Sequence, residues 1–91
     1  MSAYYVDKEN PGLGYYQFWQ HSQTLEWRWS WTEVAKDVEY SDDGPWRTSL
    51  AEAMRDAAAD WESNGSPSMN RRFAGMLMGL ATKAEKRESN V

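Results

Sequence analysis

The chain has 91 residues, six tryptophans, no cysteine and a formal net charge of −4. This length suits one domain with a small core, and the lack of thiols excludes disulfides and thiolate metal sites. No apolar run approaches the roughly 18 residues of a membrane-spanning helix, and the first residues lack a signal-peptide pattern, so we expect a cytoplasmic protein without membrane contact.

The charges are distributed unevenly. Residues 1–66 carry 5 basic and 12 acidic side chains, a balance of −7, whereas residues 67–91 carry 5 basic and 2 acidic ones, a balance of +3. The larger part should therefore repel nucleic acid, which leaves one modest basic element at the end of the chain.

The first part of the chain predicts an aromatic hairpin. A short strand is expected at residues 3–6 and a turn at 7–12, where Asn, Pro and Gly follow one another. Residues 14–20 and 25–31 predict two strands joined by a loop at 21–24, since the first is rich in aromatic residues and the second alternates large apolar with polar residues. The apolar face of the second strand, expected to pack on helices, consists of Leu25, Trp27, Trp29 and Trp31.

Residues 32–40 leave two alternatives open, because the run can form a strand or the beginning of a helix. The end of this run, Val38–Tyr40, favours a strand. The turn-forming residues Ser41–Pro45 are expected to end whichever element precedes them.

Two helices follow. Ser49 and Glu52 fit a capping box that begins the first helix, Asn64-Gly65 ends it, and Pro67 opens the second. In both segments apolar residues recur at three- and four-residue steps. The first stripe is Leu50, Ala53, Met54, Ala57, Ala58 and Trp61, and the second is Met69, Phe73, Met76, Leu77, Leu80 and Ala84.

Gly75 and Gly79, four residues apart, predict close helix packing on a neighbouring face of the second helix. Together the elements predict a single α+β domain over residues 1–91. It should contain an antiparallel sheet of three or four strands (about 1–46) with two C-terminal helices (about 47–88) packed on one face.

The sequence carries no signature of catalysis, metal binding or cofactor binding. His21 is the single histidine and is expected to be an ordinary turn residue. The pair Asp42-Asp43 lies in a turn motif without the calcium-loop pattern, and no phosphate-binding glycine loop follows a strand. We therefore expect a non-enzymatic protein without metal or cofactor.

The surplus of aromatic rings is the main functional hint. Both sides of the strand at 14–20 carry aromatic residues, and two helices cover one face of a sheet, so some rings should remain in solvent, where Trp and Tyr anchor protein interfaces. The acidic segment 33–43 either protects a sheet edge or steers a basic partner. The predicted partner-binding residues are Tyr15, Tyr16, Phe18, Trp19, Glu33, Asp37, Glu39, Asp42 and Asp43.

The stretch Gly44–Ala57, placed after two aromatic strands, resembles the strand-to-helix junction of small proteins encoded by phages and mobile elements, including host-defence inhibitors of the anti-CRISPR type. The resemblance covers roughly residues 14–62 and transfers no site residue. It implies a short, acidic, non-enzymatic protein that occupies the working surface of a host protein.

Two other functions stay open. One is a nucleic-acid-binding module that uses the basic second helix, although a solvated helix face explains the same charges and the acidic surroundings of the hairpin disfavour nucleic acid. The other is a homo-oligomer, such as a homodimer, that pairs through Gly75 and Gly79 or through the aromatic face. The basic residues of the second helix are Arg71, Arg72, Lys83, Lys86 and Arg87.

Overall fold

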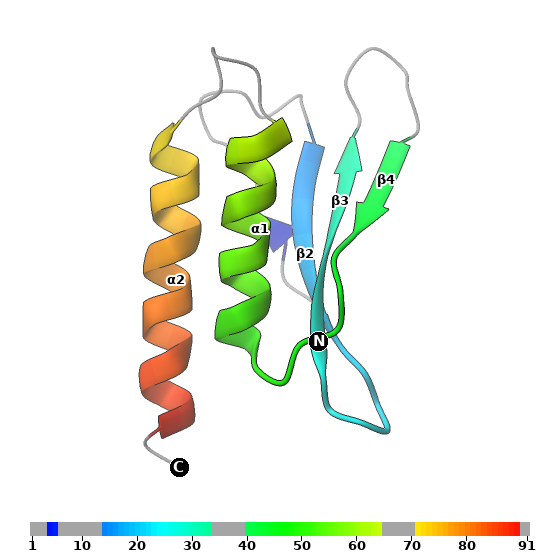
Figure 1. Ribbon diagram of the computed structural model, residues 1–91, viewed down its shortest axis with the longest axis vertical. Coiled ribbons are helices and arrows are strands. Elements are labelled where there is room, and N and C mark those ends of the chain that lie inside the picture. Colours follow the sequence, from blue (N-terminus) through cyan, green and yellow to red (C-terminus); the bar gives the residue numbers. More distant parts are fainter. Residues whose placement is uncertain (1–3, 6–13, 34–39, 65–70, 90–91) are drawn as a thin grey trace.

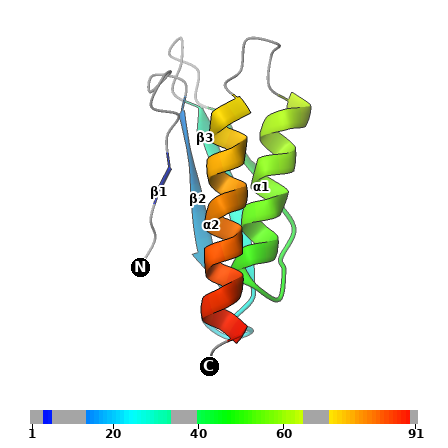
Figure 2. The ribbon, with the colours of Figure 1, turned by 90° about the vertical axis from the view of Figure 1, so that its left-hand side faces the viewer.

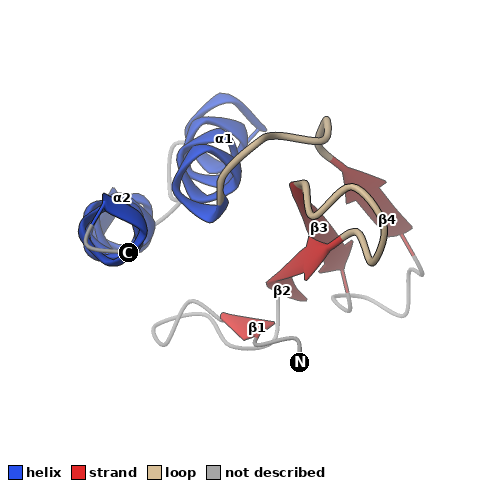
Figure 3. Ribbon diagram, turned by 90° about the horizontal axis from the view of Figure 1, so that it is seen from below, coloured by secondary structure: helices blue, strands red, loops and turns tan. Residues whose placement is uncertain are grey.

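The computed structural model describes residues 4–5, 14–33, 40–64 and 71–89. These residues form a two-layer α+β fold in which two C-terminal helices lie on one face of an antiparallel sheet (Figures 1 and 3). The fold class predicted from the sequence is confirmed.

Within the described ranges the sheet has four antiparallel strands in the order β1-β2-β3-β4. Tyr16 lies opposite Trp31, and Phe18 lies opposite Trp29. Because successive side chains of a strand point to opposite faces, these four residues define one face, here called the inner face, and their neighbours define the outer face. The strands are β1 (Tyr4–Tyr5), β2 (Gly14–Gln20), β3 (Trp27–Glu33) and β4 (Tyr40–Asp43).

The inner face packs on the helices α1 (Leu50–Asn64) and α2 (Arg71–Ser89). Trp61 of α1 and Phe73 of α2 meet edge to face with ring centroids 4.7 Å apart, and both rings also contact Tyr16. Buried aromatic pairs in this geometry add stability beyond their buried area. The other buried aromatic side chains of the sheet are Phe18 and Trp29, with Trp27 and Trp31 partly buried beside them. The prediction that these three tryptophans face the helices is confirmed.

A polar contact within this aromatic core joins the sheet to α1. The Tyr16 hydroxyl donates a hydrogen bond to Asp60 Oδ2 at 2.7 Å and thereby connects β2 to α1. Burial of the ring raises the pKa of Tyr16 far above its ordinary value, and the hydrogen bond and charge of Asp60 raise this pKa further. The hydroxyl is therefore a neutral donor at neutral pH.

The first helix begins as the sequence predicts. The Glu52 N–H donates to Ser49 Oγ at 3.2 Å, and the hydroxyls of Thr48 and Ser49 donate to Glu52 Oε1. Ser49 thereby satisfies one backbone donor that the first turn of a helix leaves unpaired. The two hydroxyl hydrogen bonds lower the pKa of Glu52, which keeps the carboxylate charged.

The two helices run side by side in front of the sheet (Figure 2). Small buried side chains on both helices, including Ala58 and Ala81, allow them to approach closely. Arg55 and Glu85 add an ion pair between the helices. Predicted Met69 and the start at Pro67 lie outside the described residues, and the other members of both predicted stripes are buried or partly buried.

The prediction for Gly75 and Gly79 is wrong for the described part of the chain. A Cβ atom built on either glycine would meet no heavy atom within 4 Å, and both residues are exposed on α2. The stripe around Phe73 and Leu77 faces the core instead, and the helical repeat places the glycines on the opposite side.

Two boundaries in the sheet also differ from the predictions. Leu25 does not begin β3, because its φ of 63° places it in a turn, where 60% of its surface is exposed. The loop is closed by hydrogen bonds from the His21 N–H to Glu26 O and from the Leu25 N–H to His21 O. Ser41–Asp43, predicted together with Gly44 and Pro45 to break the preceding element, instead belong to strand β4, which pairs with β3.

Candidate functional site

The outer face of the sheet is the surface that both described helices leave open (Figure 3). Its side chains are those that alternate with the buried inner residues. They are Tyr15, Gln17 and Trp19 of β2, Arg28, Ser30 and Thr32 of β3, and Ser41 and Asp43 of β4.

Trp19 is the largest exposed side chain on these strands, with 42% of its surface in solvent. Its indole N–H donates to Ser30 Oγ at 2.7 Å, so the ring is held towards the neighbouring strand rather than projecting freely. Ser30 is buried as a result. The hydrogen bond fixes the orientation of a ring that presents much of its surface to solvent.

A second exposed tryptophan follows β4. Trp46 has 37% of its surface in solvent and lies in an extended segment beside β3. The N–H groups of Trp27 and Arg47 donate to the carbonyl oxygen of the other residue at 2.7 and 2.6 Å, and the Gly44 N–H donates to Trp29 O at 2.9 Å. The backbone on both sides of Trp46 is therefore anchored to the sheet.

The same segment is connected to α1. Arg47 Nε and Nη2 donate to the two carboxylate oxygens of Asp56 at 2.7 and 3.1 Å, and the hydrogen bond to Asp56 raises the pKa of Arg47. Such two-point pairing also restricts the geometry of the arginine. Trp46 and Arg47 thus extend from opposite faces of one extended segment.

Gly44 is required at the start of this segment. A Cβ atom at this position would overlap the indole of Trp29. The Trp29 indole occupies the space that a side chain at position 44 would need, so glycine allows the backbone of this segment to pass close to the ring.

Arg28 connects the two exposed tryptophans. It is the direct cross-strand neighbour of Trp19, and its guanidinium carbon lies 4.8 Å from the centroid of the Trp46 ring. Arg28 Nε donates to Gly44 O at 3.2 Å, and Arg28 Nη2 lies 3.5 Å from Asp43 Oδ2. Cation–π contact and charge pairing together orient the side chain. We call Trp19, Arg28, Ser30, Asp43 and Trp46 the outer-face platform.

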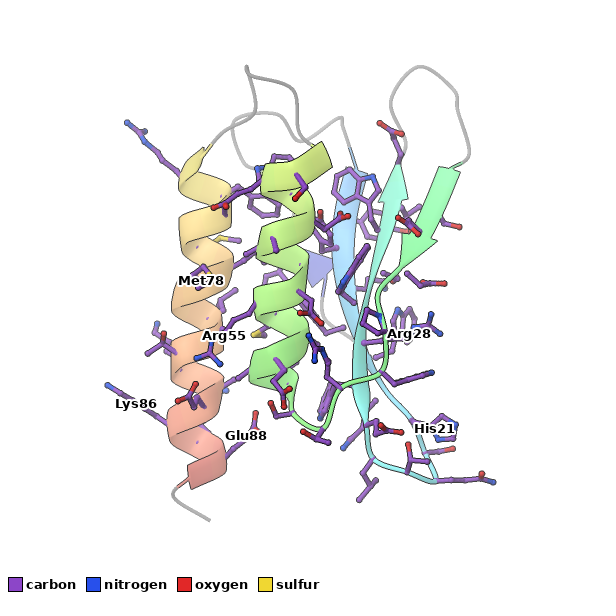
Figure 4. All side chains as sticks on the ribbon, viewed as in Figure 1. His21, Arg28, Arg55, Met78, Lys86 and Glu88 are labelled. Atoms are coloured by element: carbon purple, nitrogen blue, oxygen red, sulfur yellow. The ribbon has the colours of Figure 1, made fainter. Side chains whose placement is uncertain are left out.

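His21 lies below Arg28 of the outer-face platform in the view of Figure 4. Its Nδ1 accepts hydrogen bonds from the backbone N–H groups of Gln23 and Thr24 at 3.1 and 3.3 Å. Its ring also meets Trp46 edge to face with centroids 5.2 Å apart. The predicted turn role is confirmed, and the imidazole additionally supports Trp46.

Carboxylates lie along the β4 edge of the sheet. Asp42 and Asp43 are exposed, and the Asp43 N–H donates to Asp42 Oδ1 at 2.9 Å. The hydrogen bond between Gly44 and Trp29 implies that the Asp43 N–H points away from β3, since pairing alternates along antiparallel strands. The Asp42 carboxylate therefore accepts the hydrogen bond of a backbone N–H that points away from the sheet. This disfavours the addition of another strand at this point.

The structure separates the predicted partner-binding residues into different surroundings. Trp19 and Asp43 belong to the outer-face platform, and half-buried Tyr15 lies further along the same face. Half-buried Glu33 and exposed Asp42 alternate with the outer-face residues and therefore belong to the inner face, on the β3–β4 side of the sheet. The predicted residues Asp37 and Glu39 lie outside the described residues.

The assignment of Tyr16 and Phe18 to a partner surface is wrong. Their exposed fractions are 1% and 4%, because both rings point to the inner face and pack with the helices. The sequence shows aromatic residues on both sides of β2 but does not show which side the helices cover. The pairing of Tyr16 with Trp31 and of Phe18 with Trp29 places both rings on the face that the helices cover.

Sequence reasoning missed three members of this region. Trp46 is a tryptophan outside both helical stripes, and Arg28 is the single base within the aromatic hairpin, so both were recognisable as unusual. The contribution of Ser30 had no sequence signal, because it depends on the position of the Trp19 indole across two strands.

The basic residues predicted for the alternative function lie on α2. Arg72, Lys83, Lys86 and Arg87 are exposed, whereas the side chain of Arg71 is outside the described part. Among the residues with described positions, no three His, Cys, Asp or Glu side chains gather as a metal site would require. Neither helix, over its described length, combines the length and apolarity needed to cross a membrane.

Comparison with known proteins gives no family model, curated protein or solved structure that matches this chain.

Proposed function

We propose that this protein is a small non-enzymatic binding module that docks on a partner protein through the outer-face platform. The observation that carries the proposal is the pair of oriented, exposed tryptophans, Trp19 and Trp46, on both sides of Arg28 on a sheet face that no described helix covers. Trp and Arg are the residue types that most often dominate binding energy at protein interfaces.

The size of the exposed aromatic surface supports a protein partner. If a Trp side chain offers about 250 Å², the exposed parts of the two rings together present roughly 200 Å². A standard interface buries about 800 Å² on each partner, so the two rings would supply about a quarter of it. That share suits the apolar centre of an interface surrounded by a polar rim.

The orientation of the platform also supports docking. Trp19 is held by Ser30, and Trp46 lies in a segment bonded to β3 and α1. Side chains that are already ordered lose little conformational entropy on binding, and this increases the affinity available from a given area.

The charge around the platform favours a protein with a basic surface over a nucleic acid. Asp43 of the platform lies beside Arg28, and exposed Asp42 adds a carboxylate at the same edge of the sheet, on its inner-face side. Such a rim attracts Lys and Arg of a protein partner, whereas phosphate groups would be repelled. In the setting implied by the resemblance to phage accessory proteins, the module would cover a functional surface of a host protein.

The proposal is tested by differential capture from a host lysate. The wild-type protein, the double variant Trp19→Thr/Trp46→Thr and the control variant Met78→Thr are immobilised at equal density. Met78, on α2, is 44% exposed, so the control removes a comparably exposed apolar side chain away from the platform. Removal of a hot-spot tryptophan costs at least about 2 kcal/mol, or roughly 30-fold in Kd.

We expect one stoichiometric protein to be retained by the wild type and by Met78→Thr and to be lost from the double variant. Cooperative thermal unfolding of all three proteins establishes that they are folded. Equal capture of the same protein by the double variant contradicts the proposal, as does the absence of any stoichiometric partner. Sedimentation of the wild type alone as a dimer that the double variant does not form would identify a second copy as the occupant.

A further inference from the structure

We infer that the solvent face of α2 is a second binding surface, which receives the phosphate backbone of a nucleic acid. The surface consists of Arg72, Lys83, Lys86 and Arg87, here called the α2 basic face. All four side chains are exposed, and the helical repeat of about 100° per residue places them within an arc of about 100°. This arc is on the opposite side of α2 from Ala74 and Ala81, which are buried.

The acidic residues of α2 contact α1 and do not belong to the α2 basic face. Glu85 pairs with Arg55 of α1, and Glu88 Oε1 accepts a hydrogen bond from the Ala51 N–H at the start of α1 at 3.4 Å. Figure 4 shows Glu88 on the side of α2 that faces α1 and Lys86 pointing away from α1. The fold thus separates the charges of α2, so that the α2 basic face carries a single sign.

Two positions near the middle of this surface carry no side chain. Gly75 and Gly79 lie between Arg72 and Lys83, and a Cβ atom on either glycine would meet nothing within 4 Å. The described fold therefore does not need glycine at these positions, although glycine weakens a helix interior relative to alanine. Glycine allows a ligand to approach the helix backbone closely, which suits an extended polyanion lying along α2.

The composition of the α2 basic face favours phosphate over a protein. Its exposed large apolar residue is Met78 alone among the described positions of α2, and lysine is depleted at protein interfaces. A second copy of α2 would bring like charges together. Phosphate groups, in contrast, are commonly bound by Lys and Arg without an apolar centre.

The acidic strand β4 is remote from this surface. Figure 1 places α2 and the acidic strand β4 at opposite ends of the intermediate axis of the molecule, whose extent is 25 Å. Charges separated by more than about 10 Å are largely screened at 0.1 M salt. The carboxylates of β4 therefore do not prevent local binding of a polyanion at α2.

The dimensions give a quantitative expectation. Arg72 and Arg87 are separated by about 22 Å along the helix axis at about 1.5 Å per residue. If each of the four bases contacts one phosphate, the logarithm of the binding constant should fall with the logarithm of the salt concentration with a slope of about −3.6. Binding should be independent of sequence, since the contacts reach phosphates rather than base edges.

The test uses the full-length protein and a fluorescently labelled mixed-sequence DNA duplex of about 20 base pairs, followed by anisotropy from about 50 to 200 mM salt. The variant Lys83→Gln/Lys86→Gln removes two bases from α2. The control Ala59→Glu/Ser63→Glu lowers the net charge by the same amount at exposed positions of α1. Thermal unfolding of each variant verifies the fold.

We expect the wild type to bind, the lysine variant to bind at least tenfold more weakly with a slope shallower by about 2, and the control to bind within about twofold of the wild type. Absence of binding at low salt overturns the inference, as does equal weakening by the two variants. Equal competition by poly-L-glutamate at the same charge concentration would instead indicate a protein-type acidic ligand. The Trp19→Thr/Trp46→Thr variant should bind the duplex like the wild type, which separates this inference from the proposed protein-binding function.

Discussion

The Tyr16→Phe substitution tests the polar contact at the centre of the core. The Tyr16 hydroxyl donates to Asp60 at 2.7 Å while its ring is almost fully buried. A hydrogen bond to a charged acceptor contributes about 1.5–3 kcal/mol, so we expect the substitution to lower the free energy of unfolding by about 2 kcal/mol. Urea unfolding at pH 7, followed by circular dichroism, measures this loss. The control Tyr5→Phe, whose half-buried ring packs on Phe18, should change it by less than about 0.5 kcal/mol.

The pH dependence of the same substitution gives a second, independent readout. Burial and then Asp60 raise the pKa of Tyr16 in the folded protein above the unfolded value of about 10. The contribution of Tyr16 to the free energy of unfolding is therefore fully present below about pH 10. It is lost as pH rises above that value, at about 1.4 kcal/mol per pH unit. The difference in the free energy of unfolding between the wild type and Tyr16→Phe should therefore shrink above about pH 10. It should vanish near about pH 11.5, where the wild type has lost about 2 kcal/mol of stability. An unchanged stability at pH 7, or a deficit that is constant between pH 9 and about 11, would refute this reasoning.

Three further substitutions test local features of the fold by urea or thermal unfolding. Gly44→Ala should destabilise the protein by about 1–3 kcal/mol, because its Cβ would overlap the Trp29 indole; an unchanged midpoint would show that the indole can move aside. Ser49→Ala should cost about 1 kcal/mol by removing the acceptor for the Glu52 N–H, whereas Ser49→Asp, which retains an acceptor, should cost much less. Gly79→Ala should stabilise the protein by up to about 1 kcal/mol, because the added methyl group meets open space; destabilisation would mean that the position is not open in solution.

The helices were predictable because their signals are local. The capping box at Ser49 and Glu52 operates within one turn, and the spacing of Leu50 to Trp61 identifies the buried side of α1. The alternation of Trp27, Trp29 and Trp31 likewise identifies the inner face of β3.

The errors concern contacts between residues far apart in the chain. Whether Tyr16 or Trp19 faces the helices depends on the register with β3, and the position of Trp46 depends on backbone hydrogen bonds across the sheet. Leu25 continues the alternating pattern and is therefore predicted in the strand, but the hairpin requires a positive φ there. Gly79 was expected at a helix contact, although the described fold leaves it open.

Site-specific photo-crosslinking tests the role of the outer-face platform most directly. A benzoylphenylalanine is placed either at Ser41, exposed on the outer face of β4, or at Ala59, exposed on α1, and each protein is irradiated in host lysate. We predict a single protein adduct from position 41 that excess wild-type protein suppresses and excess Trp19→Thr/Trp46→Thr protein does not. An adduct that forms from position 59 but not from position 41, or that both competitors suppress equally, would contradict docking through the outer face.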